Sequence, residues 1–352
     1  MTQNKIKILA IETSCDETSA AVIEDGKRIL SNIISSQRDT HSLYGGVVPE
    51  IASREHLKLL VPVVEKSLAL AGVELDDIDA LAVTRGPGLV GPLLVGLSYA
   101  KALSYAKRIP IIPLNHIKCH IYANFLEDSL TKNQGMELEF PLMALVVSGG
   151  HSDIIYLKSH HELEIVGETL DDAAGEAFDK IARALDLGYP GGPEIDKLAR
   201  EGKPKEVEFP RATLKERSYD FSFSGLKSAV LNYLNQCKMK NEPINKEDIA
   251  LGFQQSVIDQ LVTNTLKACK ERQVEELLIA GGVSANSALR EEFKERAEKK
   301  GIRVSFPPPI LCTDNAAMVG ACGYWYYVSG RIEKIQNRLD LNAVPNLSLE
   351  DN

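Results

Sequence analysis

Two segments of the chain repeat one pattern, in which an apolar run is interrupted by a short polar turn and then resumes. The first is IKILAIETSCDETSAAVIED, from Ile6 to Asp25, and the second is PLMALVVSGGHSDIIYL, from Pro141 to Leu157. Apolar runs bounded by small polar residues predict strands, so each segment predicts a hairpin. Strands and helices alternate after each hairpin, which predicts a duplicated α/β domain, arranged as two lobes with a cleft between them.

The same patterns predict further elements. In the first half we expect a helix interrupted or kinked near Pro62, a strand ending in a glycine turn, a second helix and a short strand (49–72, 79–88, 92–108 and 109–114). In the second half we expect a strand, glycine loop and helix closed by Gly301, then a proline-broken strand and a last helix (275–301, 302–309 and 313–330).

The composition is that of a globular protein, with 44% hydrophobic and 25% charged residues. The six cysteines are scattered and form no CxxC pair, which argues against a zinc ribbon or a disulfide-rich secreted protein. No run approaches the roughly 18 apolar residues of a membrane helix, and the first residues lack the apolar run of a signal peptide. We therefore expect a cytoplasmic protein with no membrane contact.

The formal net charge of −9 is unusual for a protein that binds nucleic acid by bulk attraction. A nucleic-acid-binding function would need a local basic surface or a partner's charge. The segment from Lys197 to Arg217 carries seven Lys/Arg against four Glu and is the candidate surface. A solvated surface insertion explains the same composition.

A glycine turn, RGPGLVG from Arg85 to Gly91, matches GxGxxG between a predicted strand and helix. A dinucleotide fold also needs an acidic residue at the end of the next strand, but that strand ends in Asn115 and His116. Pro87 within the turn fits the motif poorly as well. We therefore favour a turn whose glycines allow close backbone packing. No GxxxxGK[ST] phosphate loop occurs.

Two other glycine turns have the composition of anion sites. VVSGGHSD, from Val146 to Asp153, exposes several backbone N–H groups without bulky side chains, although a plain hairpin turn would look the same. AGGVSAN, from Ala280 to Asn286, ends a strand and begins a helix, which favours an anion or nucleotide nearby. Ser284 could equally serve only as the cap of that helix.

A segment rich in carboxylates and small residues extends from Leu170 to Ala199. Asp172, Glu176 and Asp179 recur at helical spacing, as they would on a solvated helix face. The YPGGPEID that follows predicts a rigid exposed turn, with Asp196 as a hydroxyl acceptor.

Two histidines four residues apart occur in NHIKCH. On a helix His116 and His120 would share one face and could bind one metal ion, but two ordinary helix residues have the same spacing. Zinc or iron would need a third ligand, for which Asp314 in CTDNAAM is the candidate, unless it is only a helix cap. Ile117 stands where the HExxH motif has its glutamate, so a metalloprotease would lack its general base.

Eight motifs in this order carry a resemblance to a known family: IETSCDETSAAV, NHIKCH, VVSGGH, DDAAGEAFDK, YPGGPEID, FSFSGLKSA, AGGVSAN and CTDNAAM. The chain resembles the TsaD family, the tRNA N6-adenosine threonylcarbamoyltransferases once described as glycoproteases, over about residues 8–323. It looks more like the bacterial branch than the mitochondrial one.

The resemblance implies an ATPase fold of the actin, sugar kinase and Hsp70 type. The first lobe is expected at residues 1–112, with a helix at about 325–352 packing back on it. The second lobe, 113–324, would carry the metal and nucleotide site and a helical insertion at about 195–245.

The resemblance also implies site residues. One divalent metal, Fe²⁺ or Zn²⁺, would be bound by His116, His120 and Asp314. Asp16 and Glu17, on the first hairpin's turn, are our candidates for proton handling. Substrate contacts carry over to nine positions: Val146, Val147, Ser148, Gly149, Gly150, Asp179, Gly192, Asp196 and Asn286. Many members have a second histidine where Asn115 stands, but that position is not a metal ligand.

The implied reaction transfers threonylcarbamoyl from threonylcarbamoyl-AMP to N6 of the adenosine beside the anticodon, in tRNAs that read A-starting codons, and releases AMP. ATP or ADP is the alternative occupant of the nucleotide site. The donor is an activated mixed anhydride, so no covalent enzyme intermediate is expected. The implied partners are tRNA, a TsaB-like paralogue that forms a heterodimer with this chain, a TsaE-like ATPase and a TsaC-type synthase that supplies the adenylate.

Three other functions fit parts of the sequence. A small-molecule kinase or carbamoyltransferase of the same fold would have no need for the two histidines and Asp314. A regulatory ATP-binding subunit would tolerate replacement of both histidines. A protease would cleave peptides, which the missing HExxH glutamate argues against.

Overall fold

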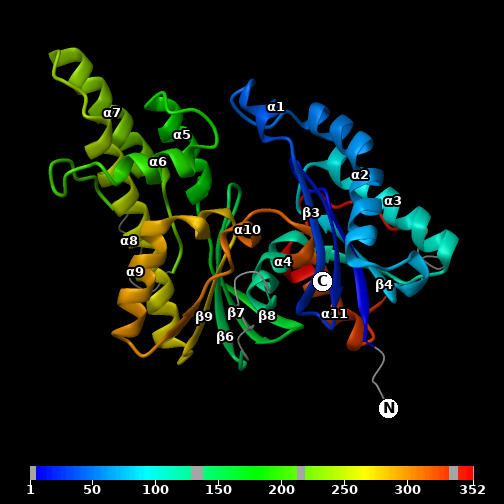
Figure 1. Ribbon diagram of the computed structural model, residues 1–352. Helices are drawn as coiled ribbons and strands as arrows, with labels where there is room; N and C mark the ends of the chain where they lie inside the picture. The colour runs from blue at the N-terminus through cyan, green and yellow to red at the C-terminus, as the bar shows by residue number, and fades with distance from the viewer. Residues whose placement is uncertain (1–4, 128–137, 212–218, 333–339, 352) are drawn as a thin grey trace. The chain divides into compact units, whose positions relative to one another are not determined.

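The computed structural model describes residues 5–127, 138–211, 219–332 and 340–351 (Figure 1). The chain forms two compact units. Unit 1 comprises Met1–Glu137 and Pro307–Asn352, and unit 2 comprises Leu138–Phe306. Among the described residues, no helix has both the length and the apolar character needed to cross a membrane.

Unit 1 is built on a five-stranded sheet with the strand order β3-β2-β1-β4-β5. β1 pairs antiparallel with β2 and parallel with β4, and β4 pairs parallel with β5. The strands are β1 (Lys7–Glu12), β2 (Glu17–Glu24), β3 (Arg28–Ser36), β4 (Ala80–Gly86) and β5 (Ile111–Asn115). The helices are α1 (Arg38–Ser42), α2 (Pro49–Ala71), α3 (Val90–Lys107), α4 (His116–Tyr122), α10 (Pro309–Cys312) and α11 (Ala316–Val328), with short 3-10 turns at Leu75–Asp77, Ala123–Phe125 and Leu349–Asp351.

Alternate residues of β1 face different helices, as the two-residue period of a strand requires. Leu9 and Ile11 share a core cluster with residues of α2 and α3. On the opposite face, Gly320 and Gly323 of α11 lie against the side chains of Ala10 and Ile8. α11 therefore approaches the sheet closely because these two positions have no side chain.

Unit 2 is built on a second five-stranded sheet, with the order β10-β9-β6-β7-β8. One face packs against helices through a cluster that includes Leu145, Ile279, Phe178, Phe253 and Phe293. The strands are β6 (Leu142–Val147), β7 (Ser152–Ser159), β8 (Glu162–Gly167), β9 (Glu276–Ala280) and β10 (Arg303–Ser305). The helices are α5 (Ala174–Ala184), α6 (Gly191–Ala199), α7 (Ser224–Lys240), α8 (Lys246–Glu271) and α9 (Ser287–Glu298), with the 3-10 turn η3 (Gly282–Ala285) between β9 and α9.

The two sheets have the same topology. β6 pairs antiparallel with β7 and parallel with β9, as β1 pairs with β2 and β4. β8 and β10 occupy the outer positions that β3 and β5 occupy in unit 1. The duplicated α/β domain predicted from the two hairpins is therefore present, and each hairpin gains a third antiparallel strand, β3 or β8, that the sequence patterns did not indicate.

The division between the units differs from the predicted boundaries at 112/113 and 324/325. α4 stays in unit 1 because it begins at the residue after β5, and Asp314 and α11 return to unit 1 because α11 covers one face of its sheet. The predicted helix at about 325–352 is also wrong within the described residues. There α11 ends at Val328, and residues 340–348 form no helix.

Two other local expectations need correction. α2 continues through Pro62, which lies on its exposed side, so the expected interruption is not seen. YPGGPEID is not an exposed turn, because α6 begins at Gly191 within it. Of the predicted insertion at 195–245, the described part contains the end of α6 and all of α7, while residues 212–218 lie outside the described residues.

Candidate active site

The histidine helix α4 begins directly after β5, and Asn115 is the residue that makes this possible. Its Oδ1 accepts hydrogen bonds from the backbone N–H groups of Ile117 (2.9 Å) and Lys118 (3.1 Å). An Asn at this position caps a helix by satisfying its first free N–H groups. The cap fixes the helix start at His116.

His116, His120 and Asp314 lie together in unit 1, with their ligand atoms all within 4.8 Å of one another. Asp314 Oδ1 is 3.4 Å from His116 Nε2 and 3.1 Å from His120 Nε2. Two ligand atoms bound at about 2.1 Å to a tetrahedral ion lie about 3.4 Å apart. The spacing of these three groups therefore fits one divalent metal ion.

The surroundings of His120 support the same conclusion. The side chain is 1% exposed, yet among the described residues neither of its ring nitrogens has a hydrogen-bond partner. The 3.1 Å approach of Asp314 lacks the angle of a hydrogen bond. Buried polar atoms are normally paired, so an unpaired imidazole aimed at a carboxylate and a second imidazole has the donor set of a metal site. The alternative role of Asp314 as a helix cap is wrong, because Asn315 caps α11 by accepting from Met318 N.

The protonation of this group follows from burial and charge. Burial by itself raises the pKa of Asp314, but the charge of His116 and the close contacts with both imidazoles outweigh it and bring the pKa below its ordinary value. Burial lowers the pKa of His116, but the Asp314 and Glu12 carboxylates raise it well above the ordinary value. Burial keeps the pKa of His120 low, against the opposing effect of Asp314. Among the three groups, His116 is therefore the one that favours a proton, whereas His120 favours its neutral form and Asp314 its negative form.

Glu12, at the end of β1, contacts the other side of His116. Its Oε2 lies 3.1 Å from His116 Nδ1 and accepts a hydrogen bond from Thr84 Oγ1 at 2.5 Å. Ser14 Oγ also lies 3.2 Å from the same Nδ1. Burial favours the neutral form of Glu12, but the charge and hydrogen bond of His116 bring its pKa below the ordinary value.

The predicted proton-handling residues lie in the same unit. Glu17 begins β2, and Asp16 precedes it in the turn of the first hairpin. Burial, then the charges of Asp314 and Asp16, raise the pKa of Glu17 to about 9. Glu17 is therefore an electrostatic neighbour of the candidate metal ligand Asp314.

The RGPGLVG turn is covered by the C-terminal tail of the same unit. Gly88 N donates to Pro345 O at 3.0 Å, and Val344 N donates to Arg85 O at 2.9 Å. A Cβ on Gly86 would overlap Val344 O. The favoured interpretation, a glycine turn for close backbone packing, is confirmed, and a dinucleotide has no access to these N–H groups.

The predicted substrate-binding residues all belong to unit 2. Val146 and Val147 end β6, and Ser148, Gly149 and Gly150 form the turn before β7. AGGVSAN follows the neighbouring parallel strand β9, so both turns lie at carboxyl ends of parallel strands. Ligands of open α/β sheets bind at such ends.

Other motifs of unit 2 pack against the Ser148–Gly150 turn. Gly175 N, in the first turn of α5, donates to Ser148 O at 3.2 Å, and a Cβ on Gly175 would lie 2.5 Å from that oxygen. Gly281, at φ +87°, leaves no room for a side chain beside Val147 O. Gly149 and Gly150 differ, because a Cβ at either would meet nothing within 4 Å. Neither space nor backbone angle within unit 2 requires glycine at these two positions.

Asp179 connects α5 to α6. Its Oδ1 accepts from Gly191 N at 2.7 Å, at the first residue of α6. Burial raises the pKa of Asp179, an effect that this hydrogen bond partly offsets. Gly192 is the next residue, and a Cβ there would also meet open space. The structure thus brings Asp179 and the glycines of YPGGPEID together.

Asp196 and Asn286 already have partners within the unit. Asp196 accepts from Ser287 Oγ at 3.0 Å and from Arg200 Nη2 at 3.1 Å. Asn286 caps α9 through Leu289 N and donates to Gln254 Oε1 at 2.8 Å. A ligand that uses these groups must share or displace these bonds. Because Asn286 caps α9, Ser284 is not its cap.

The polar groups of the FSFSGLKSA motif bind Asp171. This carboxylate accepts from the hydroxyls of Ser222 and Ser224 and from the backbone N–H groups of Phe223 and Ser224, at 2.5–3.2 Å. The neighbouring Asp172 forms ion pairs with Lys180 and Lys227. Both acids therefore anchor α7.

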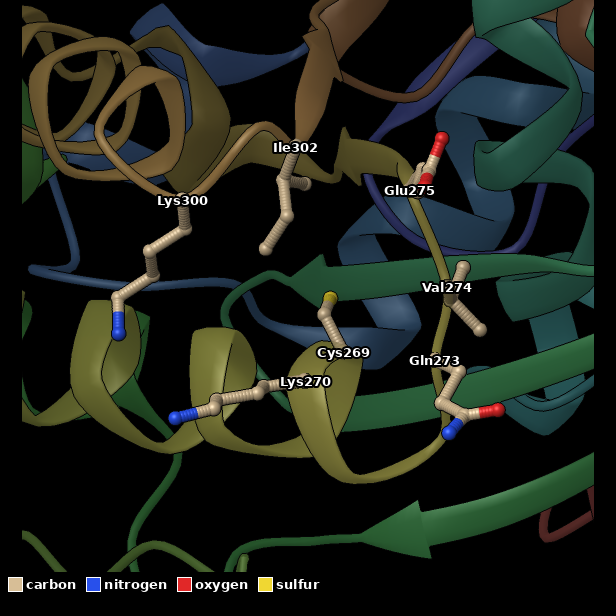
Figure 2. Close-up of a pocket in the computed structure, with 7 residues that line it drawn as sticks. All are labelled: Cys269, Lys270, Gln273, Val274, Glu275, Lys300 and Ile302. Atoms are coloured by element: carbon tan, nitrogen blue, oxygen red, sulfur yellow. The ribbon is translucent and has the colours of Figure 1, made fainter.

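Figure 2 shows a cavity of about 370 Å³ in unit 2, where α8 ends and β9 begins. It lies at the amino end of β9, whereas AGGVSAN follows the carboxyl end. None of the predicted site residues lines it; the lining residues are Cys269, Lys270, Gln273, Val274, Glu275, Lys300 and Ile302.

The basic segment at 197–217 is described only as far as Arg211. Within that part, Arg200 pairs with Asp196 and Arg211 pairs with Asp259. Lys203 and Lys205 are exposed. The described part thus offers less free positive charge than the sequence suggested.

Comparison with known proteins identifies the family. A family model described as TsaD, tRNA N6-adenosine threonylcarbamoyltransferase, matches residues 28–321. The chain belongs to this family. Relatives of that name from Clostridium botulinum (strain 657 / Type Ba4) and Clostridium perfringens (strain SM101 / Type A) are each 56% identical to it. The first alignment covers 99% of this chain and 99% of the relative, and the second covers 98% and 99%.

Solved structures show what fold this TsaD-family chain has. Full-length HypF in a phosphate- and nucleotide-bound form matches with a TM-score of 0.60 at 14% identity, over 92% of this chain and 46% of HypF. Component A of the (R)-2-hydroxyglutaryl-CoA dehydratase of Acidaminococcus fermentans matches with a TM-score of 0.51 at 13% identity, over 92% and 99%. These likenesses concern the fold alone, which is the actin, sugar kinase and Hsp70 type predicted from sequence.

Sequence reasoning missed several residues of the TsaD-family site in unit 1. In the sequence, Glu12 and Thr84 are parts of predicted strands, and His56 is part of a predicted helix. His56 is fully buried and joins Thr18 Oγ1 (2.7 Å) to Cys15 O (2.9 Å), so it supports the turn before Glu17. One signal was available: Glu12 is a charged residue that ends an otherwise apolar strand.

Proposed function

We propose that this chain transfers a threonylcarbamoyl group from threonylcarbamoyl-AMP to N6 of the adenosine beside the anticodon of tRNAs that read A-starting codons, and that AMP is the leaving group. Family membership supports the transferase activity. The observation that carries the metal-assisted form of the reaction is the convergence of His116, His120 and Asp314 in unit 1.

These three residues would hold Fe²⁺ or Zn²⁺, since two imidazoles and a carboxylate suit either ion. When bound, the metal supplies Lewis-acid stabilisation of negative charge on the donor. The buried imidazole of His120 has no competing hydrogen bond among the described residues, so its nitrogen is available for coordination.

The unit 2 turns would bind the adenylate. The N–H groups of Gly149 and Gly150 can donate to developing negative charge, whereas Ser148 N already donates to His151 O at 2.9 Å. The open space beside both glycines lets a ligand approach the backbone. Asp179 and Asp196 provide carboxylates for hydroxyl groups. Val146, Val147, Gly192 and Asn286 complete the proposed contacts with threonylcarbamoyl-AMP, or with ATP or ADP in its place.

No covalent intermediate is required, because the mixed anhydride is already activated. Among the described residues, the hydroxyl group that most resembles a histidine-activated nucleophile is that of Ser14, because its Oγ lies 3.2 Å from His116 Nδ1. In a Ser-His-Asp triad the serine and the carboxylate contact different ring nitrogens. Here Glu12 contacts the same Nδ1, which argues against an acyl-enzyme and against the protease alternative.

The N6 amine loses a proton as the new bond forms. We assign proton handling to Asp16 and Glu17. Burial, followed by the charges of Asp314 and Asp16, raises the pKa of Glu17 to about 9, and a bound cation would lower it towards the working range of a base.

The proposed partners are tRNA, a TsaB-like paralogue, a TsaE-like ATPase and a TsaC-type synthase, all in the cytoplasm. The net charge of −9 supports tRNA binding that depends on partner proteins. An apolar groove of about 510 Å³ between α2 and α3 supports a partner on unit 1. Leu57 (67% exposed) and Val61 (45%) line this groove. We assign it to the TsaB-like paralogue.

The deciding experiment incubates the chain with threonylcarbamoyl-AMP and unmodified tRNA, with and without the three partner proteins, and analyses the nucleosides. We expect N6-threonylcarbamoyladenosine with partners present, and at least about a 100-fold loss in the His116→Ala/His120→Ala variant, as for loss of several kcal/mol of metal stabilisation. The double variant should also lose bound metal. His160→Ala/His161→Ala is the matched control and should keep both. Absence of the modified nucleoside in every mixture would refute the proposal.

The partner assignment has its own test. Leu57→Glu/Val61→Glu places two charges in the groove and should abolish co-purification with the paralogue while the fold is retained. Leu70→Glu, at a 64% exposed position of α2 outside the groove lining, is the control. Equal paralogue binding by both variants would contradict the assignment.

A further inference from the structure

Glu12 is a fully buried carboxylate whose two oxygens both have partners. Oε1 accepts from Ser14 N at 2.6 Å, and Oε2 accepts from Thr84 Oγ1 at 2.5 Å. Within the part of the chain that the structure describes, no lysine or arginine pairs with it, and its one ion-pair contact is His116. A buried carboxylate without a permanently charged lysine or arginine partner is costly, so a structural purpose alone explains it poorly.

The contact with His116 decides which ring nitrogen faces the metal ligands. Glu12 Oε2 lies 3.1 Å from Nδ1, and Asp314 Oδ1 lies 3.4 Å from Nε2 on the opposite side of the ring. A carboxylate that accepts from Nδ1–H keeps the hydrogen there and leaves the Nε2 lone pair free for coordination. It also fixes the rotation of the ring.

His120 has no equivalent support. Its Nδ1 is buried and, among the described residues, has no hydrogen-bond partner. The two histidines therefore differ: the orientation of His116 is set by a carboxylate at the end of β1, and that of His120 by packing on α4. Thr84 holds the carboxylate in turn, from the neighbouring parallel strand β4.

We propose that Glu12 is a positioning residue of the metal centre, which orients His116 and increases its basicity as a ligand, with Thr84 holding Glu12 in place. This inference rests on the proposed metal site and adds the residues outside the ligand set on which metal affinity depends. Loss of such a partner typically costs about 10–100-fold in metal affinity.

The test measures Co²⁺ binding to the full-length chain by competition with a chelator, together with the d–d absorption spectrum of the bound ion. Glu12→Gln keeps the shape but removes the charge, and we expect about 10–100-fold weaker binding and an altered spectrum. Glu12→Asp restores the charge and should recover part of the affinity. Circular dichroism of each metal-free variant checks the fold.

Glu24→Gln is the matched control. Glu24 is also a buried acid of the same sheet, 6% exposed, but it bonds to Lys5 and Arg28. Its variant should bind Co²⁺ as the unmodified chain does. Unchanged affinity and spectrum in Glu12→Gln would overturn the positioning role while leaving the metal site intact.

If Glu12→Gln does not fold, Thr84→Val replaces it in the test. This near-isosteric change removes only the hydroxyl that holds Glu12, and we expect a smaller loss of affinity, about 3-fold or more. A Thr84→Val variant with unchanged affinity would then overturn the inference. Failure of the unmodified chain to bind Co²⁺ would overturn the proposed metal site and this inference with it.

Discussion

Gly86 ends β4 and Gly149 lies two residues beyond the end of β6, but the structure requires only one of them to be glycine. Gly86 touches the tail, where a Cβ would overlap Val344 O. Gly149 has open space beside it and no backbone angle that demands glycine. A glycine that the fold does not need is consistent with a ligand that approaches its backbone.

The two glycines should therefore respond differently to the same substitution. Gly86→Ala forces the tail away and should lower the free energy of unfolding by about 1–3 kcal/mol. Gly149→Ala should change it by less than about 0.5 kcal/mol yet reduce transfer activity about 10-fold or more, because the methyl group occupies the ligand's space. Urea unfolding and the nucleoside assay measure the two effects. Full activity in Gly149→Ala would remove the support that this turn gives to substrate binding.

Asp153, on β7, is 8% exposed, and burial followed by the charge of Glu168 raises its pKa to about 7. The folded state then keeps a proton that the unfolded chain loses near pH 4. Stability from this group is present at low pH and is lost as the pH rises from about 4 to 7. Asp153→Asn carries no charge at any pH and avoids this loss.

We expect Asp153→Asn to stabilise the protein at pH 8 by on the order of 3 kcal/mol relative to its effect at pH 4.5. Urea titrations of both proteins at the two pH values measure the difference. Glu168→Gln is the control: it removes the second cause of the shift, so it should reproduce only part of the effect. A difference that does not change with pH would show that Asp153 titrates normally.

At the scale of an element, the side chain of Asn115 both caps the start of α4 and holds the C-terminal tail. Asn115 Oδ1 caps the helix, while Nδ2 donates to Leu347 O and Ser348 O of the C-terminal tail at 3.2 Å. The residue is fully buried. Asparagine at this position therefore has a structural use.

Two substitutions separate these functions. Asn115→Ala loses the cap and leaves the buried carbonyl of Leu347 and the partly buried carbonyl of Ser348 without this donor, for a cost of about 2–4 kcal/mol. Asn115→Asp keeps the acceptor for the cap but has no donor for the tail. Hydrogen exchange should be faster at both the α4 and tail amides in the first variant, and only at tail amides such as Val344 in the second. Equal protection of the tail in both variants would contradict this division.

The elements also show what sequence patterns can and cannot predict. Strands such as Lys7–Glu12 and helices such as α3 followed from local periodicity, because each buries a face that its own residues define. The unit boundaries did not follow, because the return of α11 to the first sheet depends on contacts between residues far apart in sequence. The pairing of His116 with Asp314 was implied by the family resemblance. The Glu12 contact depends on how β1 and β5 are placed in one sheet, which no local pattern contains.

At the scale of the whole molecule, the two units have one topology but differ in continuity. Unit 2 is a single segment, Leu138–Phe306, with its own sheet and helix-covered core. Unit 1 needs both ends of the chain, since α11 covers the face of β1 that carries Ile8 and Ala10. All three candidate metal ligands belong to unit 1, although two, His116 and His120, come from its first segment and one, Asp314, comes from its second.

Fragments should behave accordingly. We expect residues 138–306 to fold alone with a cooperative thermal transition, and residues 1–137 alone to remain unfolded, because one face of their sheet would be exposed. A chain that joins 1–137 to 307–352 through a Gly/Ser linker should regain structure and bind one Co²⁺, whereas 138–306 should bind none at the same concentration. Circular dichroism and Co²⁺ absorption measure these outcomes. Two results would contradict this account of how unit 1 assembles its metal centre. One is a folded 1–137 fragment, and the other is Co²⁺ bound to 138–306 with the d–d absorption of histidine coordination.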